Sequence, residues 1–147
     1  MRCIWCRKKK QLLLAIKAAF KKRGQFCIMD YVITAQGKDS PRITAWNAAD
    51  EHVSYFWSKE EYAAAFSGMK LKLRVTEDMT AQYCAMITEG FRQLTHTMQE
   101  LIESETDPVK KSDLHRALAY ESNRWAVRAE AMHAGDIAFI RFSGDTG

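Results

Sequence analysis

Apolar residues recur with a helical period near the start of the chain. Between residues 8 and 22 they fall on one side of a helix at about 100° per residue, while Lys10, Lys17 and Lys21 fall on the opposite side. Gly24 follows where a glycine commonly ends a helix. The pattern predicts an amphipathic N-terminal helix whose apolar side consists of Trp5, Leu12, Leu13, Ile16, Ala19 and Phe20.

The period changes in residues 25–75, which are rich in β-branched and aromatic residues. Turn-forming clusters separate three candidate strands in meander order, at 26–34, 42–46 and 52–57. Ser58 and Glu61 have the spacing of a capping box and predict a short helix over 59–66. A strict alternation then predicts a strand over 69–75, with Met69, Leu71, Leu73 and Val75 on its apolar face.

A helical period returns at Thr76, which we expect to cap a long helix. Asp107 and Pro108 then mark the start of a second long helix, and Gly135 marks its end. Each helix has about 26 residues and a length of about 39 Å, close to the expected domain diameter, so the hairpin spans the molecule or projects from it. The seam of the first helix is predicted at Ile87, Phe91, Leu94, Met98 and Leu101.

Together these segments predict one α+β domain over residues 1–147. It comprises a basic N-terminal helical arm (1–24), a small antiparallel sheet of three to five strands with a short helix (25–75), a long antiparallel helix hairpin (76–135), and a final strand with a tail (136–147). Two helices cannot cover both sides of their apolar stripes, so we expect the hairpin to lie on the sheet or to meet another molecule.

Charge is unevenly distributed along the chain, although the net charge is only +4. Residues 1–24 carry nine basic side chains and no acidic one, whereas residues 76–147 carry seven basic and twelve acidic side chains. The basic helix has three interpretations: it packs on the sheet, contacts nucleic-acid phosphates, or lies in the plane of a membrane surface. The residues predicted to contact a nucleic acid or an acidic partner are Arg7, Lys8, Lys9, Lys10, Lys17, Lys21, Lys22 and Arg23.

Motifs that would identify a cofactor or metal are missing from the sequence. It has no glycine-rich phosphate loop, no nucleophile elbow and no acidic calcium loop. Cys3 and Cys6 form a CxxC pair, but zinc needs two further ligands, and neither Cys27 nor Cys84 has a cysteine or histidine close by. We therefore predict no cofactor and no metal site. Asp50, Glu51 and His52, before a predicted strand, are the most plausible acid–base cluster.

The cysteine usage and the short apolar runs favour a cytoplasmic protein without a transmembrane segment. A secretory signal is the alternative for the basic start, but Lys17 interrupts its apolar stretch.

Three functional hypotheses follow from the sequence. The first is a non-enzymatic adaptor or inhibitor that docks on a protein or nucleoprotein partner, for example a mobile-element-encoded inhibitor of a defence system. Its contact residues would be Arg92, His96, Gln99 and Glu103 on the polar face of the hairpin, and a homodimer is compatible with it. The second is a nucleic-acid-associated regulator that uses residues 1–24. The third is a small enzyme with a site near Asp50 and His52.

Overall fold

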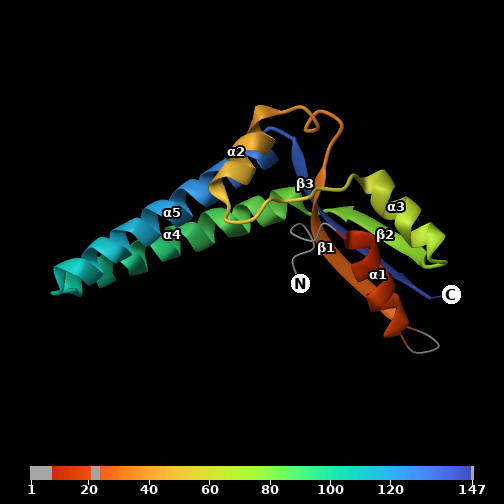
Figure 1. The fold of residues 1–147 in the computed structure, drawn as a ribbon, viewed down its shortest axis with the longest axis horizontal. Helices are drawn as coiled ribbons and strands as arrows, with labels where there is room; N and C mark the ends of the chain where they lie inside the picture. The colour runs from red at the N-terminus through yellow and green to blue at the C-terminus, as the bar shows by residue number, and fades with distance from the viewer. Residues whose placement is uncertain (1–7, 21–23, 147) are drawn as a thin grey trace.

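The computed structural model describes residues 8–20 and 24–146 and confirms the predicted α+β class. The described elements, in chain order, are α1 (Lys9–Ala18), β1 (Gln25–Ile33), α2 (Pro41–Ala49), α3 (Lys59–Gly68), β2 (Lys72–Asp78), α4 (Thr80–Ser104), α5 (Pro108–His133) and β3 (Ile137–Asp145). Figure 1 shows the two long helices α4 and α5 extending away from the sheet as a hairpin.

The three strands form one antiparallel sheet in the order β1-β3-β2. The last strand therefore lies in the middle, where Asp30 pairs with Ile140 on one side and Asp78 pairs with the same Ile140 on the other. Because β1 and β2 both run antiparallel to β3, they are parallel to each other. The predicted meander order is wrong, since the partner of both strands lies at the opposite end of the chain.

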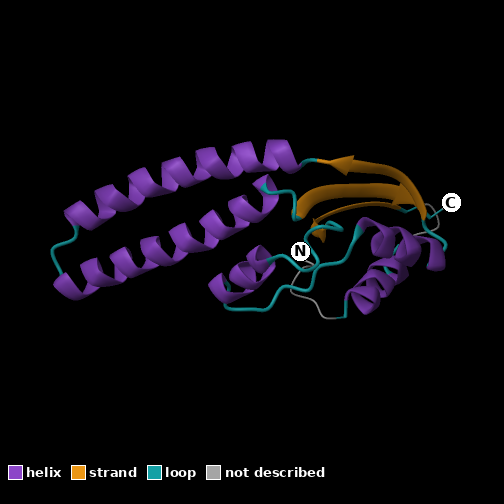
Figure 2. Cartoon of the chain, turned by 90° about the horizontal axis from the view of Figure 1, so that it is seen from above, coloured by secondary structure: helices purple, strands orange, loops and turns teal. Residues whose placement is uncertain are grey.

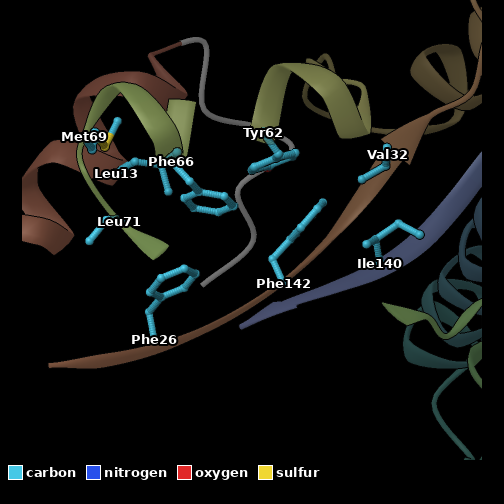
Figure 3. Packing of buried hydrophobic residues seen from close by; sticks show 9 residues of the cluster. All are labelled: Leu13, Phe26, Val32, Tyr62, Phe66, Met69, Leu71, Ile140 and Phe142. Carbon is cyan, nitrogen blue, oxygen red and sulfur yellow. The ribbon is translucent and has the colours of Figure 1, made fainter. Parts of the chain in front are cut away.

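One face of this sheet is covered by α1 and α3 (Figure 2). Tyr62 and Phe66 of α3 point from the helix toward Phe142 and Phe26 on the sheet (Figure 3), with the rings of Tyr62 and Phe142 stacked at 4.7 Å between centroids. On the opposite face, Tyr31 and Ile137 belong to a second core cluster with Trp46 of α2, Cys84 of α4 and Met132 of α5, whereas Met29 of β1 is half exposed. Helix α3 starts with the predicted capping box of Ser58 and Glu61.

The hairpin joins the sheet at the end where β1 and β2 finish. Helix α4 follows β2 after one residue, and α5 leads through Gly135, whose φ of 79° only glycine adopts easily, into β3. The amide of Met79 donates to the carbonyl of Phe139 at 2.9 Å, and the amide of Phe139 donates to the hydroxyl of Thr80 at 2.9 Å. The hairpin is thereby tied to the central strand.

Two of the predicted strands and one cap are wrong. Residues 42–46 belong to α2, whose N-cap Ser40 accepts a hydrogen bond from the amide of Arg42. Residues 52–57 form an irregular segment in which Trp57 makes a single bridge to Val32. The first long helix begins at Thr80 and not near Thr76, because residues 76–78 continue β2 along β3. The second long helix begins as predicted, with Asp107 as its cap.

The seam between the long helices also differs from the prediction. Leu94 and Leu101 are 37% and 47% exposed, whereas Ile102 is buried. The side of α4 that faces α5 consists of Ile87, Phe91, Thr95, Met98 and Ile102, all buried or partly buried. Leu94 and Leu101 therefore lie beside this seam, on a face of α4 that α5 does not cover.

Candidate functional site

An apolar pocket lies between α4 and α5 near the root of the hairpin. Its volume is about 270 Å³, close to the lower end of the range for ligand pockets. Six of its lining residues come from α4 and one from α5, and none of them carries a charge: Tyr83, Met86, Ile87, Gly90, Phe91, Leu94 and Trp125.

Tyr83 connects this pocket to the sheet. Its ring stacks on that of Phe139 at 3.9 Å between centroids, and its hydroxyl lies 2.5 Å from the hydroxyl of Tyr31 near the end of β1. Since α4 starts directly after β2, the pocket lies beyond the carboxyl end of this strand.

The pocket continues into an apolar stripe on the uncovered face of α4. At about 100° per residue, Met86, Gly90, Leu94 and Leu101 fall within about a quarter-turn of one another. Met86 is 62% exposed, and a Cβ atom added to Gly90 would meet nothing within 4 Å. Gly90 thus leaves a gap in the side-chain layer where the pocket meets the stripe.

The wall formed by Trp125 is supported from behind by a buried ion pair. The guanidinium carbon of Arg128 lies 4.9 Å from the centre of the Trp125 ring and 5.3 Å from that of Trp46. Arg128 donates to both carboxylate oxygens of Asp50, at 2.7 and 2.6 Å, and both side chains are almost fully buried. Arg124 donates to the same carboxylate at 2.7 Å. Asp50 therefore holds the cation against which Trp125 rests.

This arrangement changes the interpretation of the cluster predicted at Asp50, Glu51 and His52. The carboxylate of Asp50 is paired with two arginines and its side chain is only 2% exposed, so it serves as the anion of an internal ion pair. Glu51 and His52 are exposed and, with Asp50, Tyr120, Glu121 and Arg124, border a separate polar cavity of about 330 Å³.

The residues predicted to form a basic contact surface do not share one environment. Lys9 is buried, and its ammonium group donates to Asp30 at 3.0 Å and to Tyr62 at 3.3 Å. Lys17 donates to the carbonyl of Met69. Lys8 and Lys10 are exposed, whereas Arg7, Lys21, Lys22 and Arg23 lie outside the described residues. The α1 helix therefore uses two of its lysines to attach to the core, which agrees with the interpretation that it packs on the sheet.

The predicted protein-contact residues lie together on an exposed face of α4. Arg92 pairs with Glu89 at 2.8 Å, and His96 lies 3.5 Å from Glu100. These pairs join residues of the same helix, so they are surface interactions that contribute little to stability.

The structure gives no support for a metal site within residues 8–20 and 24–146, which contain no group of three histidine, cysteine or acidic side chains able to hold an ion. Cys3 and Cys6 lie outside these residues. Among the described helices, none is both long and apolar enough to cross a membrane.

A second polar cluster closes the loop after β1. Asp136, just before β3, accepts from the hydroxyl of Ser40 at 2.5 Å, from the amide of Gln36 at 3.2 Å and from Arg42 at 3.2 Å. The hydrogen bond from Ser40 lowers the pKa of Asp136 below its ordinary range, and those from Gln36 and Arg42 act in the same direction against burial. Because the pKa is lowered by folding, the carboxylate stabilises the fold above its ordinary pKa, and this stability is lost as the pH falls toward the folded value.

Replacing Ser40 with alanine should therefore destabilise the protein by about 1–2 kcal/mol at neutral pH, because it removes the cap of α2 and a hydrogen bond to Asp136. The difference from wild type should narrow as the pH falls below about 4, the ordinary pKa of an aspartate, toward the lower pKa of the folded carboxylate. Urea unfolding at neutral pH and below about pH 4 measures the difference in stability, with Ser67→Ala, at an exposed position, as control. An equal loss at both pH values would contradict the role of Ser40 toward Asp136.

The sequence interpretation missed the pocket. Its one local signal was the apolar series Met86, Gly90 and Leu94 at four-residue spacing on α4. Only Leu94 of that series belongs to the predicted seam, and the pattern did not single out Met86 or Gly90. The contribution of Trp125 depends on how far α5 is rotated, which local patterns do not determine.

A comparison with protein-family models and with curated proteins found no match. Solved structures, however, share the fold. A phosphoethanolamine N-methyltransferase 2 from Haemonchus contortus, in complex with phosphomonomethylethanolamine and S-adenosylhomocysteine, superposes with a TM-score of 0.68 at 14% identity, over 97% of this chain and 31% of the enzyme. A mycolic acid cyclopropane synthase complexed with SAH and CTAB superposes with a TM-score of 0.69 at 11% identity, over 99% and 53%.

A geranyl diphosphate methyltransferase in complex with GPP and sinefungin superposes less closely, with a TM-score of 0.52 at 14% identity, over 84% of this chain and 37% of the enzyme. The chain thus spans about a third to a half of the length of these enzymes. At such low identity the likeness establishes the fold.

These neighbours overturn the first functional hypothesis. A non-enzymatic adaptor or inhibitor, whether of a protein or of a nucleoprotein, was predicted because no local motif indicated a site. The structures that share the fold are enzymes of small-molecule chemistry, two of them methyltransferases by name. The other two hypotheses stay predictions, although Lys9 and Asp50, which they used, are buried in internal ion pairs.

Proposed function

We propose that this chain forms the acceptor-binding part of a small-molecule methyl-transfer enzyme. The observation that carries the proposal is the apolar pocket between α4 and α5, near the sheet end of the hairpin, in a fold shared with such enzymes. Its aromatic and aliphatic walls would exclude water and hold an acceptor in one orientation, which lowers the entropic barrier to transfer. A cytoplasmic location remains a prediction from the cysteines.

The structures that share the fold contain S-adenosylhomocysteine, abbreviated SAH in one of them, or sinefungin. A nucleoside that carries a ribose and an amino-acid group needs charged and hydrogen-bonding partners, and dinucleotide sites supply them from a glycine-rich turn and a carboxylate. The apolar pocket does not fit this requirement, because none of its lining residues is charged.

We therefore place only the acceptor in this pocket and derive no chemical step through the nucleoside. In this proposal, the residues that bind the methyl donor lie outside the pocket. The role of the pocket residues is to bind the acceptor, to orient it and to keep water away from it.

A labelling experiment tests this function. Lysate from cells that produce the chain is incubated with S-adenosylmethionine carrying a radioactive methyl group, and the small molecules are then separated from protein and nucleic acid. We expect the label in the small-molecule fraction to rise several-fold above that in lysate without the chain. An unchanged small-molecule fraction, or a rise confined to protein or nucleic acid, would refute the proposal.

A further inference from the structure

Resting on the proposed function, we infer that the acceptor is a neutral lipid with a long, unbranched hydrocarbon chain. The chain would enter the pocket beside Trp125 and continue along the exposed apolar stripe of α4. Anionic acceptors, such as those with a phosphate or a diphosphate, are excluded.

The charge of the pocket favours a neutral ligand. None of its seven lining residues is charged, and the hydroxyl of Tyr83 is already bonded to Tyr31. The two cations behind its wall are paired with carboxylates, Arg128 with Asp50, and Arg124 with Asp50 and Glu121. A phosphate or diphosphate buried here would have no cationic partner, and leaving a charge unpaired in an apolar site costs several kcal/mol.

The shape of the surface favours a chain over a compact ring. The pocket extends along α4 from Tyr83 to Leu94, about 16 Å at 1.5 Å per residue. Beyond it the stripe continues to Leu101, which is 47% exposed. The missing side chain at Gly90 leaves a path between the pocket and the stripe, because an added Cβ there meets nothing within 4 Å.

The polar groups that border the stripe favour a lipid over a protein partner. Glu89 binds Arg92 through two hydrogen bonds and Gln93 through one. His96 lies beside Glu100. Protein interfaces usually combine an apolar centre with a polar rim that bonds across the interface. Here these rim groups pair with one another along the same helix, so a protein partner would have to compete with these pairs, whereas a lipid would contact only the apolar surface.

Fluorescence quenching of Trp125 tests the assignment on the full chain. The probe is the dibromo derivative of methyl stearate, a neutral long-chain ester, whose bromine atoms quench a neighbouring indole. We expect saturable quenching of the wild type and its loss in Trp125→Phe, in which the other tryptophans remain. Geranyl diphosphate and phosphoethanolamine should compete at least about tenfold more weakly than methyl stearate, because the pocket buries methylene groups and offers no cation.

Gly90→Leu fills the path without a backbone clash and should weaken binding of the ester at least about tenfold. Gly68→Leu is the matched control, since Gly68 ends α3, is absent from the pocket and also has nothing within 4 Å of an added Cβ. This control should bind the ester within about twofold of wild type. Quenching that persists in Gly90→Leu, or in Trp125→Phe, would overturn the assignment.

Two further outcomes separate this inference from the proposed function. If geranyl diphosphate competes as well as methyl stearate while labelled methyl groups still reach small molecules, the neutral-lipid assignment is wrong and the function stands. If the stripe is covered by a second copy of the chain, sedimentation will show a dimer that Gly90→Leu disrupts and the ester does not, which also overturns the assignment. Absence of any small-molecule labelling refutes the function itself.

Discussion

Asp50→Ala should lower the free energy of unfolding by about 3–5 kcal/mol, because it leaves the buried guanidinium of Arg128 without its carboxylate. For a chain of this length, the melting temperature should fall by roughly 10 °C. The loss should be accompanied by weaker ligand binding in the pocket, since Arg128 lies against the Trp125 ring that forms its wall. Urea unfolding and thermal melting measure the stability.

The neighbouring Glu51→Ala provides the control, because Glu51 is exposed and the substitution should change stability by no more than about 0.5 kcal/mol. A double-mutant cycle with Arg128→Met should show strong coupling, because the second substitution removes the charge that the first leaves unpaired. If Asp50→Ala lost activity with full stability, Asp50 would be a catalytic acid or base and the structural role described above would be wrong.

Lys9→Met should also lower the free energy of unfolding by about 3–5 kcal/mol, because it leaves one charge of a buried ion pair unpaired. Here the unpaired group is a carboxylate and not a guanidinium. The substitution leaves the carboxylate of Asp30 buried without a cation, with hydrogen bonds from the hydroxyl of Tyr62 and the backbone amide of Tyr31. Lys9 also lies 5.4 Å from the centre of the Tyr62 ring, so a cation–π contact is lost as well. Urea unfolding followed by circular dichroism measures the change.

Lys10→Met is the matched control, because Lys10 is adjacent in sequence and exposed. Replacing Lys9 and Asp30 together by methionine and leucine should recover much of the loss, since no unpaired charge then remains. A Lys9→Met variant as stable as Lys10→Met would show that α1 is not attached to the sheet through this ion pair.

Local signals in the sequence were sufficient for several elements. Ser58 with Glu61, and Asp107 with Pro108, begin helices at the predicted residues, because a cap acts on amides within the first turn. Ser40 and Pro41 are also typical of a helix start. A strand was nevertheless predicted there, because Ile43, Thr44 and Trp46 favour a strand by composition. Burial of Trp46 against Tyr31 and Arg128 requires the helix.

Long-range features could not be predicted in this way. The final strand lies in the middle of the sheet and pairs with residues that are distant in the sequence. Gln25, one partner, is more than a hundred residues away along the chain, and Lys72, another, is about seventy residues away. The pocket depends on the same pairing, because Tyr83 reaches it only where Phe139 and Tyr31 meet the start of α4. No pattern within one helix contains that information.

The central claim, that the pocket beside Gly90 binds the acceptor, is tested most directly by methyl transfer in Gly90→Leu, measured against Gly68→Leu and wild type under the same labelling conditions. We predict that Gly90→Leu loses at least about tenfold of the small-molecule labelling while its stability rises by about 0.8 kcal/mol, because leucine is the better helix former. Gly68→Leu should label like wild type. Wild-type labelling by a folded Gly90→Leu would contradict the claim.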